Sequence, residues 1–142
     1  SGVLTDDGYA YTWGEGIYHK RQTRPVHIEL PEDEIGSIRC LGIGACHALV
    51  STSNRTYSMG LNTFGQLGLG PDKTNLEVET PRPIAKLDNI PIASIKCSLY
   101  SCAVCTESGQ VFSWGAVGEG RLGHRRFKTR KGINKPDQYE PV

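Results

Sequence analysis

Short stretches of alternating apolar and polar residues recur along the chain, separated by turns rich in glycine and polar residues. Three of them align without gaps: Leu4–Gly14 (LTDDGYAYTWG), Val50–Gly60 (VSTSNRTYSMG) and Cys105–Gly115 (CTESGQVFSWG). Each predicts a β-hairpin whose second strand ends in a large apolar side chain and a glycine. Because side chains alternate between the two faces of a strand, Tyr11, Tyr57 and Phe112 should share a core-facing side with Trp13, Met59 and Trp114.

The turn of each predicted hairpin has one residue suited to a left-handed backbone. These residues are Gly8, Asn54 and Gly109. Glycine and asparagine adopt positive φ most easily, which tight hairpin turns require. Asn54 also begins an Asn-Arg-Thr glycosylation pattern, but we interpret it as a turn residue.

A glycine-rich segment follows two of the three hairpins. Gly60–Gly68 aligns with Gly115–Gly123, with glycines at the same offsets and Leu67 matched by Leu122. The stretch FGQLGLG could suggest a phosphate-binding loop, but Gly70 is followed by Pro71 and not by the Lys-Ser/Thr pair of such loops. The glycines are better explained as turns. The positions at which the repeats agree are Gly8, Trp13, Gly14, Asn54, Met59, Gly60, Gly65, Leu67, Gly68, Gly109, Trp114, Gly115, Gly120, Leu122 and Gly123.

The first copy departs from this pattern after Gly14, where the chain reads EGIYHKRQT. We therefore expect irregular geometry in the first unit. Further on, each copy reaches a proline followed by a β-branched residue, at Pro25-Val26, Pro83-Ile84 and Pro141-Val142. Residues Ile35–Cys40 and Ile92–Cys97 then alternate as strands do. The repeats accordingly span about 3–48, 49–103 and 104–142, the last one incomplete.

These motifs, above all TYSMGLNTFGQLGLG and SGQVFSWGAVGEGRLGH, resemble the regulator-of-chromosome-condensation repeat. The resemblance covers nearly the whole chain and implies an all-β fold: an antiparallel β-propeller of roughly fifty residues per blade. Met59 stands where the family usually has tryptophan, and Cys97-Ser98 where it has Cys-Gly. Residues 1–142 would form one propeller segment of about two and a half to three blades. Since such an arc exposes two apolar faces, we expect a part of a longer protein; completion by other chains is the less favoured alternative.

Composition and charge narrow the function. The net charge of +1 gives no general attraction to nucleic acid or anionic lipid, and no apolar run approaches the roughly 18 residues of a membrane span. The five cysteines are an odd number at irregular spacings, which favours a reducing intracellular compartment, cytoplasmic or nuclear.

Candidate catalytic and metal-binding groups are sparse. Cys102-x-x-Cys105 has the spacing of a zinc-ligand pair, with Cys97 nearby, but residues three apart on a strand point to opposite faces. Core packing is the favoured interpretation, and no cofactor is predicted. The four histidines and the Asp6-Asp7 pair have no evident catalytic partners. The sequence therefore does not predict an enzyme.

The densest charge feature is the segment Arg121–Lys135 (RLGHRRFKTRKGINK). A solvated loop is its favoured interpretation; the functional one is contact with an acidic protein surface or a phosphate backbone. The acidic stretch 72–79, one repeat earlier, should lie on the same rim. The candidate partner-binding residues are Arg121, His124, Arg125, Arg126, Lys128, Arg130 and Lys131.

The family resemblance implies three kinds of function. Members act as exchange factors for a Ran-type small GTPase, as chromatin-binding modules, and as regulatory domains attached to ubiquitin ligases, kinases or ciliary proteins. The sequence favours a scaffold that binds a protein partner through its loops, with a small GTPase as one candidate. Guanine-nucleotide exchange and chromatin or nucleic-acid binding are the open alternatives. The family's exchange residues cannot be matched to positions in this chain.

Overall fold

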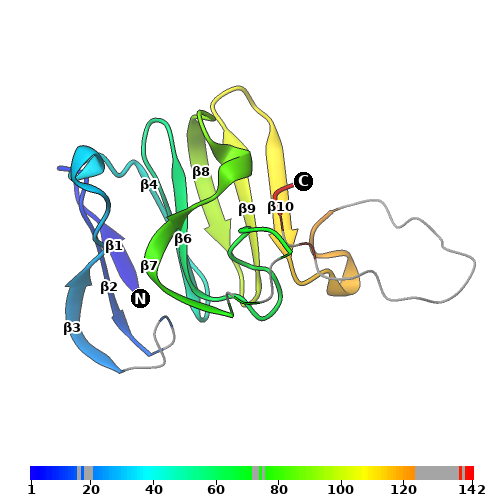
Figure 1. Cartoon of the computed structure of the whole chain (residues 1–142), viewed down its shortest axis with the longest axis horizontal. Coiled ribbons are helices and arrows are strands. Elements are labelled where there is room, and N and C mark those ends of the chain that lie inside the picture. Colours follow the sequence, from blue (N-terminus) through cyan, green and yellow to red (C-terminus); the bar gives the residue numbers. More distant parts are fainter. Residues whose placement is uncertain (16, 18–20, 72–73, 75, 124–137, 139) are drawn as a thin grey trace, which may run out of the picture.

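The structure, a computed structural model, describes residues 1–15, 17, 21–71, 74, 76–123, 138 and 140–142. The described residues form three antiparallel sheets, which stand side by side in Figure 1. The first sheet contains β1 (Gly2–Leu4), β2 (Ala10–Gly14) and β3 (Gln22–His27). The second contains β4 (Cys40–Ile43), β5 (His47–Ser51), β6 (Thr56–Leu61) and β7 (Glu77–Pro83). The third contains β8 (Ile92–Cys97), β9 (Ser101–Thr106) and β10 (Val111–Gly115).

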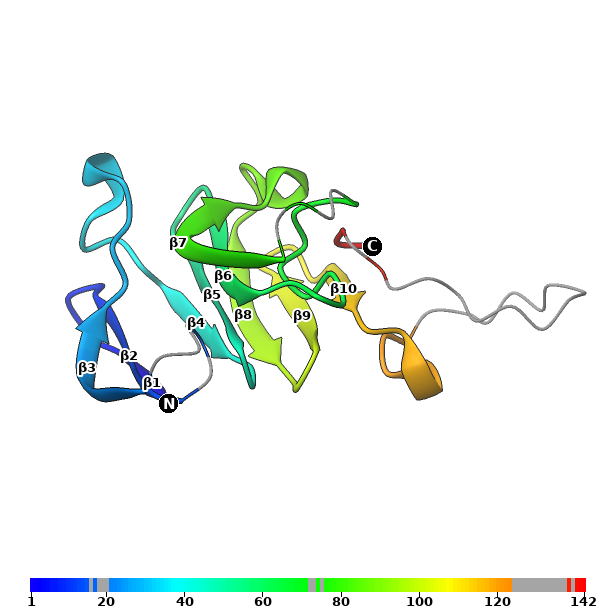
Figure 2. The same cartoon turned by 60° about the horizontal axis from the view of Figure 1, so that its bottom comes forward.

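The sheets are arranged as consecutive blades of a propeller. The first strand of each sheet lies beside that of the next, so β4 contacts both β1 and β8. Short 3-10 helices at Glu32–Glu34 and Ala85–Leu87 lie between the sheets in sequence, and a third at Gly118–Gly120 follows β10. Figure 2, a view turned by 60°, shows the same succession of sheets. No helix among the described residues is long and apolar enough to cross a membrane.

The core consists of two apolar clusters, one between each pair of neighbouring sheets. The first joins Ala10 and Ile28 to Tyr57 and Met59. The second joins Leu49 and Ile84 to Ile95 and Trp114. Strand β5 contributes to both clusters, with Ala48 and Val50 on one face and Leu49 on the other. The middle sheet is therefore covered on both faces, and every residue of β5 is buried.

The repeated aromatic positions point toward the preceding sheet. Trp114 packs on the second sheet, and Tyr57 and Met59 pack on the first. In β2 it is Ala10 and Thr12 that are buried, so Tyr11 and Trp13 lie on the opposite face of the first sheet and are only half-buried. The expectation that Tyr11 and Trp13 face a core is thus wrong within this chain, because no described element packs on that face.

Strand register makes three glycines equivalent. Gly14, Gly60 and Gly115 all have φ near +100° (97°, 107° and 103°) and pair with Gln22, Val78 and Gln138. Gln138 and Gly115 exchange two backbone hydrogen bonds, and Ser113 N donates to Val142 O at 3.1 Å. The described C-terminal residues therefore begin a fourth strand in the place that β7 takes in the second sheet.

This register corrects two sequence alignments. Thr12 pairs with Val26 and Ser58 with Arg82, so Pro81, not Pro83, corresponds to Pro25.

Residues 35–39 are expected from the sequence to belong to a strand, but they do not. The strand in this region, β4, begins at Cys40. Ile43 pairs with Ala48 as Cys97 pairs with Cys102, so Ile43 and not Cys40 corresponds to Cys97. Burial decides this register, since Leu41 and Ile43 pack on the first core cluster while Ile35 is 52% exposed.

Two further expectations need correction. Asn54 lies in the hairpin bend but does not have positive φ. The bend is held instead by Thr52, whose N donates to Arg55 O at 2.9 Å and whose Oγ1 accepts from Arg55 N at 3.2 Å.

In the first sheet, the pairing of β2 with β3 shows the same register shift as that of β6 with β7. The described residues of the first sheet thus have the same register as those of the second, and residues 16 and 18–20 of EGIYHKRQT lie outside the described part. The sheets combine strands from adjacent sequence copies, and the repeat bounds 3–48, 49–103 and 104–142 stay a prediction.

Gly60 should tolerate a side chain far less well than Gly109, although both have positive φ (107° and 86°). A Cβ at Gly60 would lie 2.4 Å from the carbonyl oxygen of Cys46, whereas one at Gly109 would meet nothing within 4 Å. Left-handed backbone alone costs an alanine about 1–2 kcal/mol, and the clash should add about 1–3 kcal/mol. Urea unfolding of Gly60→Ala and Gly109→Ala would test this; equal losses of stability would contradict the packing.

Candidate functional site: the glycine rim and the junction of the second and third sheets

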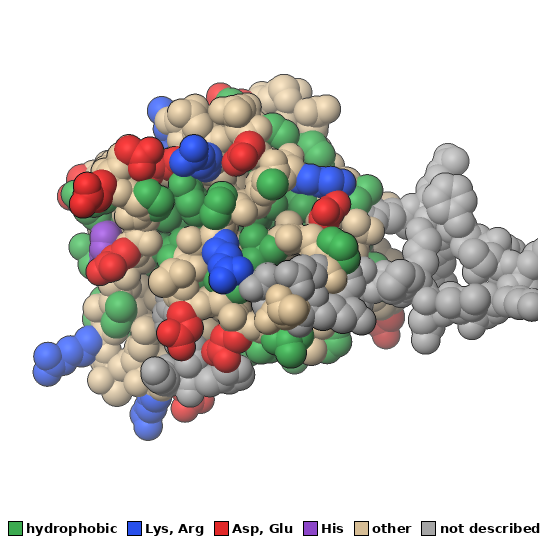
Figure 3. Space-filling view, viewed as in Figure 1, with side chains coloured by type: hydrophobic (Ala, Val, Ile, Leu, Met, Phe, Trp, Pro, Cys, Tyr) green, Lys and Arg blue, Asp and Glu red, His purple; other side chains and the backbone are tan. Residues whose placement is uncertain are grey.

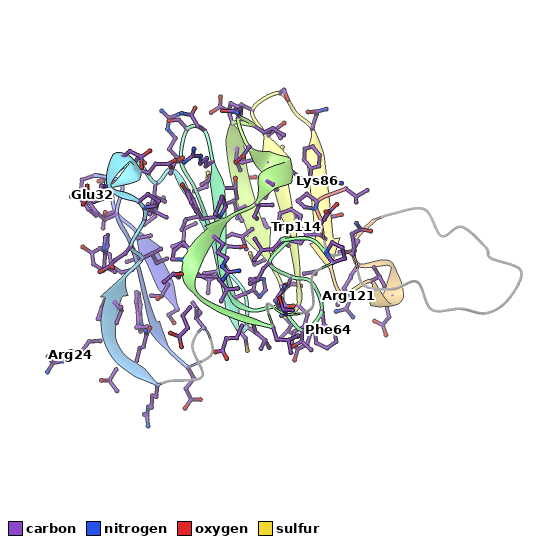
Figure 4. All side chains as sticks on the ribbon, viewed as in Figure 1. Arg24, Glu32, Phe64, Lys86, Trp114 and Arg121 are labelled. Carbon is purple, nitrogen blue, oxygen red and sulfur yellow. The ribbon has the colours of Figure 1, made fainter. Side chains whose placement is uncertain are left out.

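The loops that follow Gly14, Gly60 and Gly115 leave the sheets at equivalent positions, and we call this edge the glycine rim. Glu77 and Glu79, at the end of the acidic stretch, are exposed where β7 begins. Arg121, at the start of the basic segment, is exposed just beyond β10 (Figure 4). The described ends of the two charged stretches therefore lie along the same rim.

Arg121 is the described member of the candidate partner-binding set. Its Nε donates to the carbonyl oxygen of Gly118 at 2.9 Å, and its backbone N donates to the same oxygen at 3.2 Å. These two hydrogen bonds stabilise the turn. The other nitrogens of the exposed guanidinium remain available to contact a partner. The other members lie outside the described residues: His124, Arg125, Arg126, Lys128, Arg130 and Lys131.

Charges of both signs are interspersed on the described surface shown in Figure 3. An ion pair of 3.0 Å joins Lys86 Nζ to Glu140 Oε2, with both side chains partly exposed. It links the described C-terminal residues to the segment after β7. An exposed pair of this kind contributes little to stability and here mainly orients the chain.

The FGQLGLG segment, Phe64–Gly70, is a hydrogen-bonded turn. Gly65 N donates to Asn62 O, Leu67 N donates to Asn62 Oδ1, and Gly68 N donates to Gly65 O. Phe64 N donates to the side chain of Gln66. With these amides occupied inside the turn, they cannot form the cradle that a phosphate loop requires.

Leu67 anchors the turn, since it is fully buried and its carbonyl accepts from Ser58 Oγ at 2.8 Å. The third repeat reproduces this contact, with Ser113 Oγ donating to Leu122 O at 2.7 Å. The aligned glycine segments are therefore also equivalent in their hydrogen bonding.

Trp114 attaches the third sheet to this turn. Its Nε1 donates to the carbonyl oxygen of Gln66 at 3.0 Å, and its ring is fully buried (Figure 4). A Cβ at Gly68 would lie 2.8 Å from Trp114 Nε1, so glycine at this position makes room for the indole. The rings of Phe64 and Tyr100 pack nearby with centroids 4.9 Å apart. The turn thus acts as a connector between the second and third sheets.

Beside this connector lies a cluster of two thiols and an imidazole, which we call the thiol cluster: His47, Cys97 and Cys102. Nε2 of His47, from β5, lies 3.1 Å from Sγ of Cys102, from β9. Cys97, the residue opposite Cys102 on β8, brings its Sγ to 3.5 Å from that of Cys102. His47 and Cys102 are buried and Cys97 is partly exposed.

The cluster shifts the acidity of its thiols in opposite directions. The hydrogen bond from Cys102 stabilises the Cys97 thiolate, and together with His47 it lowers the pKa of Cys97 to about 6 despite burial. Burial raises the pKa of Cys102, and the neighbouring Cys97 raises it further. Cys97 is therefore the more acidic thiol of the pair.

The thiol cluster is not evident from the amino-acid sequence. His47 comes from the preceding repeat, 50 and 55 positions away from the two cysteines, so no local spacing connects it to them. Cys105 does not belong to the cluster; its Sγ contacts Thr106 O at 3.6 Å. The alternation along β9 thus separates Cys102 from Cys105, as a strand requires.

Replacing Trp114 by phenylalanine should destabilise the chain much more than the same change at the equivalent Trp13. Trp114→Phe removes a buried hydrogen bond and leaves Gln66 O with the weaker thiol donor Cys102 Sγ at 3.4 Å, which should cost about 1–3 kcal/mol. Trp13 is half-buried on the uncovered face of the first sheet, so Trp13→Phe should change stability by less than half as much. Urea unfolding of both variants measures the difference, and similar losses would refute the assigned packing of Trp114.

Comparison with known proteins supports the fold. A family model described as "Regulator of chromosome condensation (RCC1) repeat" matches residues 53–105. The crystal structure of Prp20p from Saccharomyces cerevisiae superposes with a TM-score of 0.76 at 20% identity, covering 99% of this chain and 35% of that one. Human WBSCR16 superposes with a TM-score of 0.69 at 23% identity, covering 98% and 34%. The expected partial, antiparallel β-propeller is thereby confirmed.

Curated relatives are similar in sequence but much longer. The human E3 ubiquitin-protein ligase HERC2 is 30% identical over 133 residues, which cover 87% of this chain and 3% of that protein. The human X-linked retinitis pigmentosa GTPase regulator is 33% identical over 102 residues, covering 72% and 9%. The Arabidopsis thaliana protein RUG3 is 30% identical over 143 residues, covering 91% and 31%. The chain spans less than a third of each of these relatives.

Proposed function

The chain contains repeats of the regulator-of-chromosome-condensation family, and from this premise we propose that it is a regulatory module that binds a protein partner through the loops of its glycine rim. The sheets would supply a rigid frame, and the rim loops the specificity. The partner surface would be acidic, because the segment that starts at Arg121, beyond the rim glycine Gly115, is the densest run of basic residues in the sequence.

The observation that carries this proposal is the equivalence of Gly14, Gly60 and Gly115. The three rim loops begin at the same place in their sheets but differ in length and sequence. Variable loops on a common, well-packed frame form a surface whose recognition can change without loss of the fold. Each of these glycines also pairs with a residue of the next strand, so strand pairing continues up to the residue at which the loop begins.

The distribution of charge along the chain favours a protein partner with an acidic surface over general binding to polyanions such as nucleic acid. The whole chain has a net charge of +1, so attraction must come from a local cluster. Arginine and lysine side chains pair with carboxylates, and arginine does so with two parallel hydrogen bonds. Such contacts give specificity and a fast encounter more than affinity.

Relatives suggest which partners to test first. One is named a GTPase regulator, and the crystal structure of Prp20p was described together with its binding properties to Gsp1p and histones. A further structure contains yeast RCC1 (Prp20) bound to Kap60. A small GTPase is therefore the first candidate partner for this chain. Exchange activity would additionally require tighter binding of the nucleotide-free than of the loaded GTPase.

The test compares a rim variant with a charge-matched control. The rim variant replaces Arg125, Arg126, Arg130 and Lys131 with alanine. The control replaces four exposed basic residues outside the rim loops with alanine: Arg24, Arg39, Arg82 and Lys96. Binding of purified Ran-type GTPase, nucleotide-free and loaded, is measured by calorimetry on the full-length protein. We expect the rim variant to weaken binding at least tenfold and the control to leave it within about twofold.

Equal binding by the rim variant and the wild type would remove the basic segment from the interface. Two further measurements separate the alternatives. Faster release of labelled GDP would identify an exchange factor, and binding without it a scaffold. Binding to duplex DNA that falls steeply with salt and is lost in the rim variant would favour nucleic acid instead.

A further inference from the structure

We propose that the thiol cluster is a zinc site, with His47 Nε2, Cys97 Sγ and Cys102 Sγ as its three protein ligands. The site lies at the junction of the second and third sheets, and it does not depend on the proposed partner. It belongs to the reduced protein, since the five cysteines of the described structure are all free thiols.

The donor atoms are already near the positions that zinc requires. Zn–S bonds of about 2.3 Å and Zn–N bonds of about 2.0–2.1 Å at tetrahedral angles place two sulfurs about 3.8 Å apart and a sulfur and a nitrogen about 3.6 Å apart. The Cys97–Cys102 and His47–Cys102 distances are 3.5 Å and 3.1 Å. All three donor atoms lie within 4.8 Å of one another. Movements of a few tenths of an ångström would complete the two pairs that include Cys102, and the His47–Cys97 pair would close from within 4.8 Å to about 3.6 Å.

Charge balance favours zinc among thiophilic cations. Two thiolates and a neutral imidazole around Zn²⁺ form a group with no net charge, which can be buried at little electrostatic cost. The same ligands around Cu⁺ would leave one uncompensated negative charge beside His47 and Cys102, whose exposed fractions are 0% and 3%. Binding displaces the protons that the thiols hold, and these are released to solvent.

The surrounding backbone leaves room for the ligands. A Cβ at Gly44 would lie 2.1 Å from Cε1 of His47, and one at Gly42 would lie 2.9 Å from Cys97 Sγ. Both glycines have ordinary φ values, so the space they leave, and not a special backbone conformation, distinguishes these positions. The ligands lie on β5 of the second sheet and on the paired strands β8 and β9 of the third, so regular sheet structure fixes their positions.

Two features set the expected strength of the site. No described side chain supplies a fourth ligand, and Cys97 is partly exposed, so a water molecule would complete the coordination. Nδ1 of His47 is buried without a hydrogen-bond partner in the described structure, whereas zinc-bound histidines normally donate this N–H. The affinity should therefore be lower than that of a closed four-ligand site, and the zinc exchangeable by chelators.

The experiment uses the full-length protein, stripped of metal and kept reduced with a phosphine. Zinc per chain is measured by mass spectrometry after equilibration, and Co²⁺ replaces zinc to report thiolate ligation through its near-ultraviolet charge-transfer absorption. The wild type should bind one equivalent. Cys97→Ser and His47→Gln should weaken binding at least about 100-fold, since loss of even an outer-shell partner costs about 10–100-fold.

Cys105→Ser is the matched control, because Cys105 lies on the same strand as Cys102 but outside the cluster. It should keep one equivalent of zinc and the Co²⁺–thiolate absorption. Because His47 is fully buried, His47→Gln risks misfolding, and Cys97→Ser, at a partly exposed position, keeps the test decisive once circular dichroism shows it folded. No zinc uptake by the reduced wild type, or unchanged uptake by folded Cys97→Ser, would overturn the proposal.

Discussion

The apolar face that one sheet presents to the next is the constraint on which the rest of this structure depends. A three- or four-stranded sheet cannot bury both of its faces alone, and the neighbouring sheet supplies the cover. In the second sheet this requirement is met twice, by the first core cluster on one side and the second on the other. Strand β5, with apolar side chains on both faces, is possible only in that position.

Close packing requires glycine at two key positions. At Gly60 the backbone of the adjacent strand in the same sheet occupies the place of a side chain, and at Gly68 the Trp114 indole of the next sheet does. The second case fixes the connector turn against the third sheet, through the bond from Trp114 to Gln66 O. The same junction brings His47 next to Cys97 and Cys102, so the thiol cluster is a product of sheet packing and not of a local motif. Parts of the rim loops also belong to this packing, since Ile17 is in the first core cluster and Leu69 packs on the second.

The fold could be largely predicted from the sequence because its signals are local. Hairpins, glycine turns and the Trp/Met/Trp positions recur with a regular period, and each depends on a few neighbouring residues. Prediction failed where burial or distant contacts decide. Residues 35–40 have the alternation of a strand, yet the strand lies at Cys40–Ile43, where Leu41 and Ile43 are partly buried against the first core cluster. Asparagine favours a left-handed turn, but at Asn54 the Thr52 side chain stabilises a bend without positive φ. The thiol cluster joins residues from two repeats, so no spacing along the chain could reveal it.

The central claim is that burial between sheets sets the order of local stability. Among the described residues, only the second sheet is covered on both faces. Native-state hydrogen exchange tests it most directly, because backbone amides in well-covered strands exchange only through large unfolding events. The amides of β5 and β6 should exchange slowest, and those of the first and third sheets, each with one face that no described element covers, should exchange faster. Protection of β1 and β2 equal to that of β5 would contradict this claim.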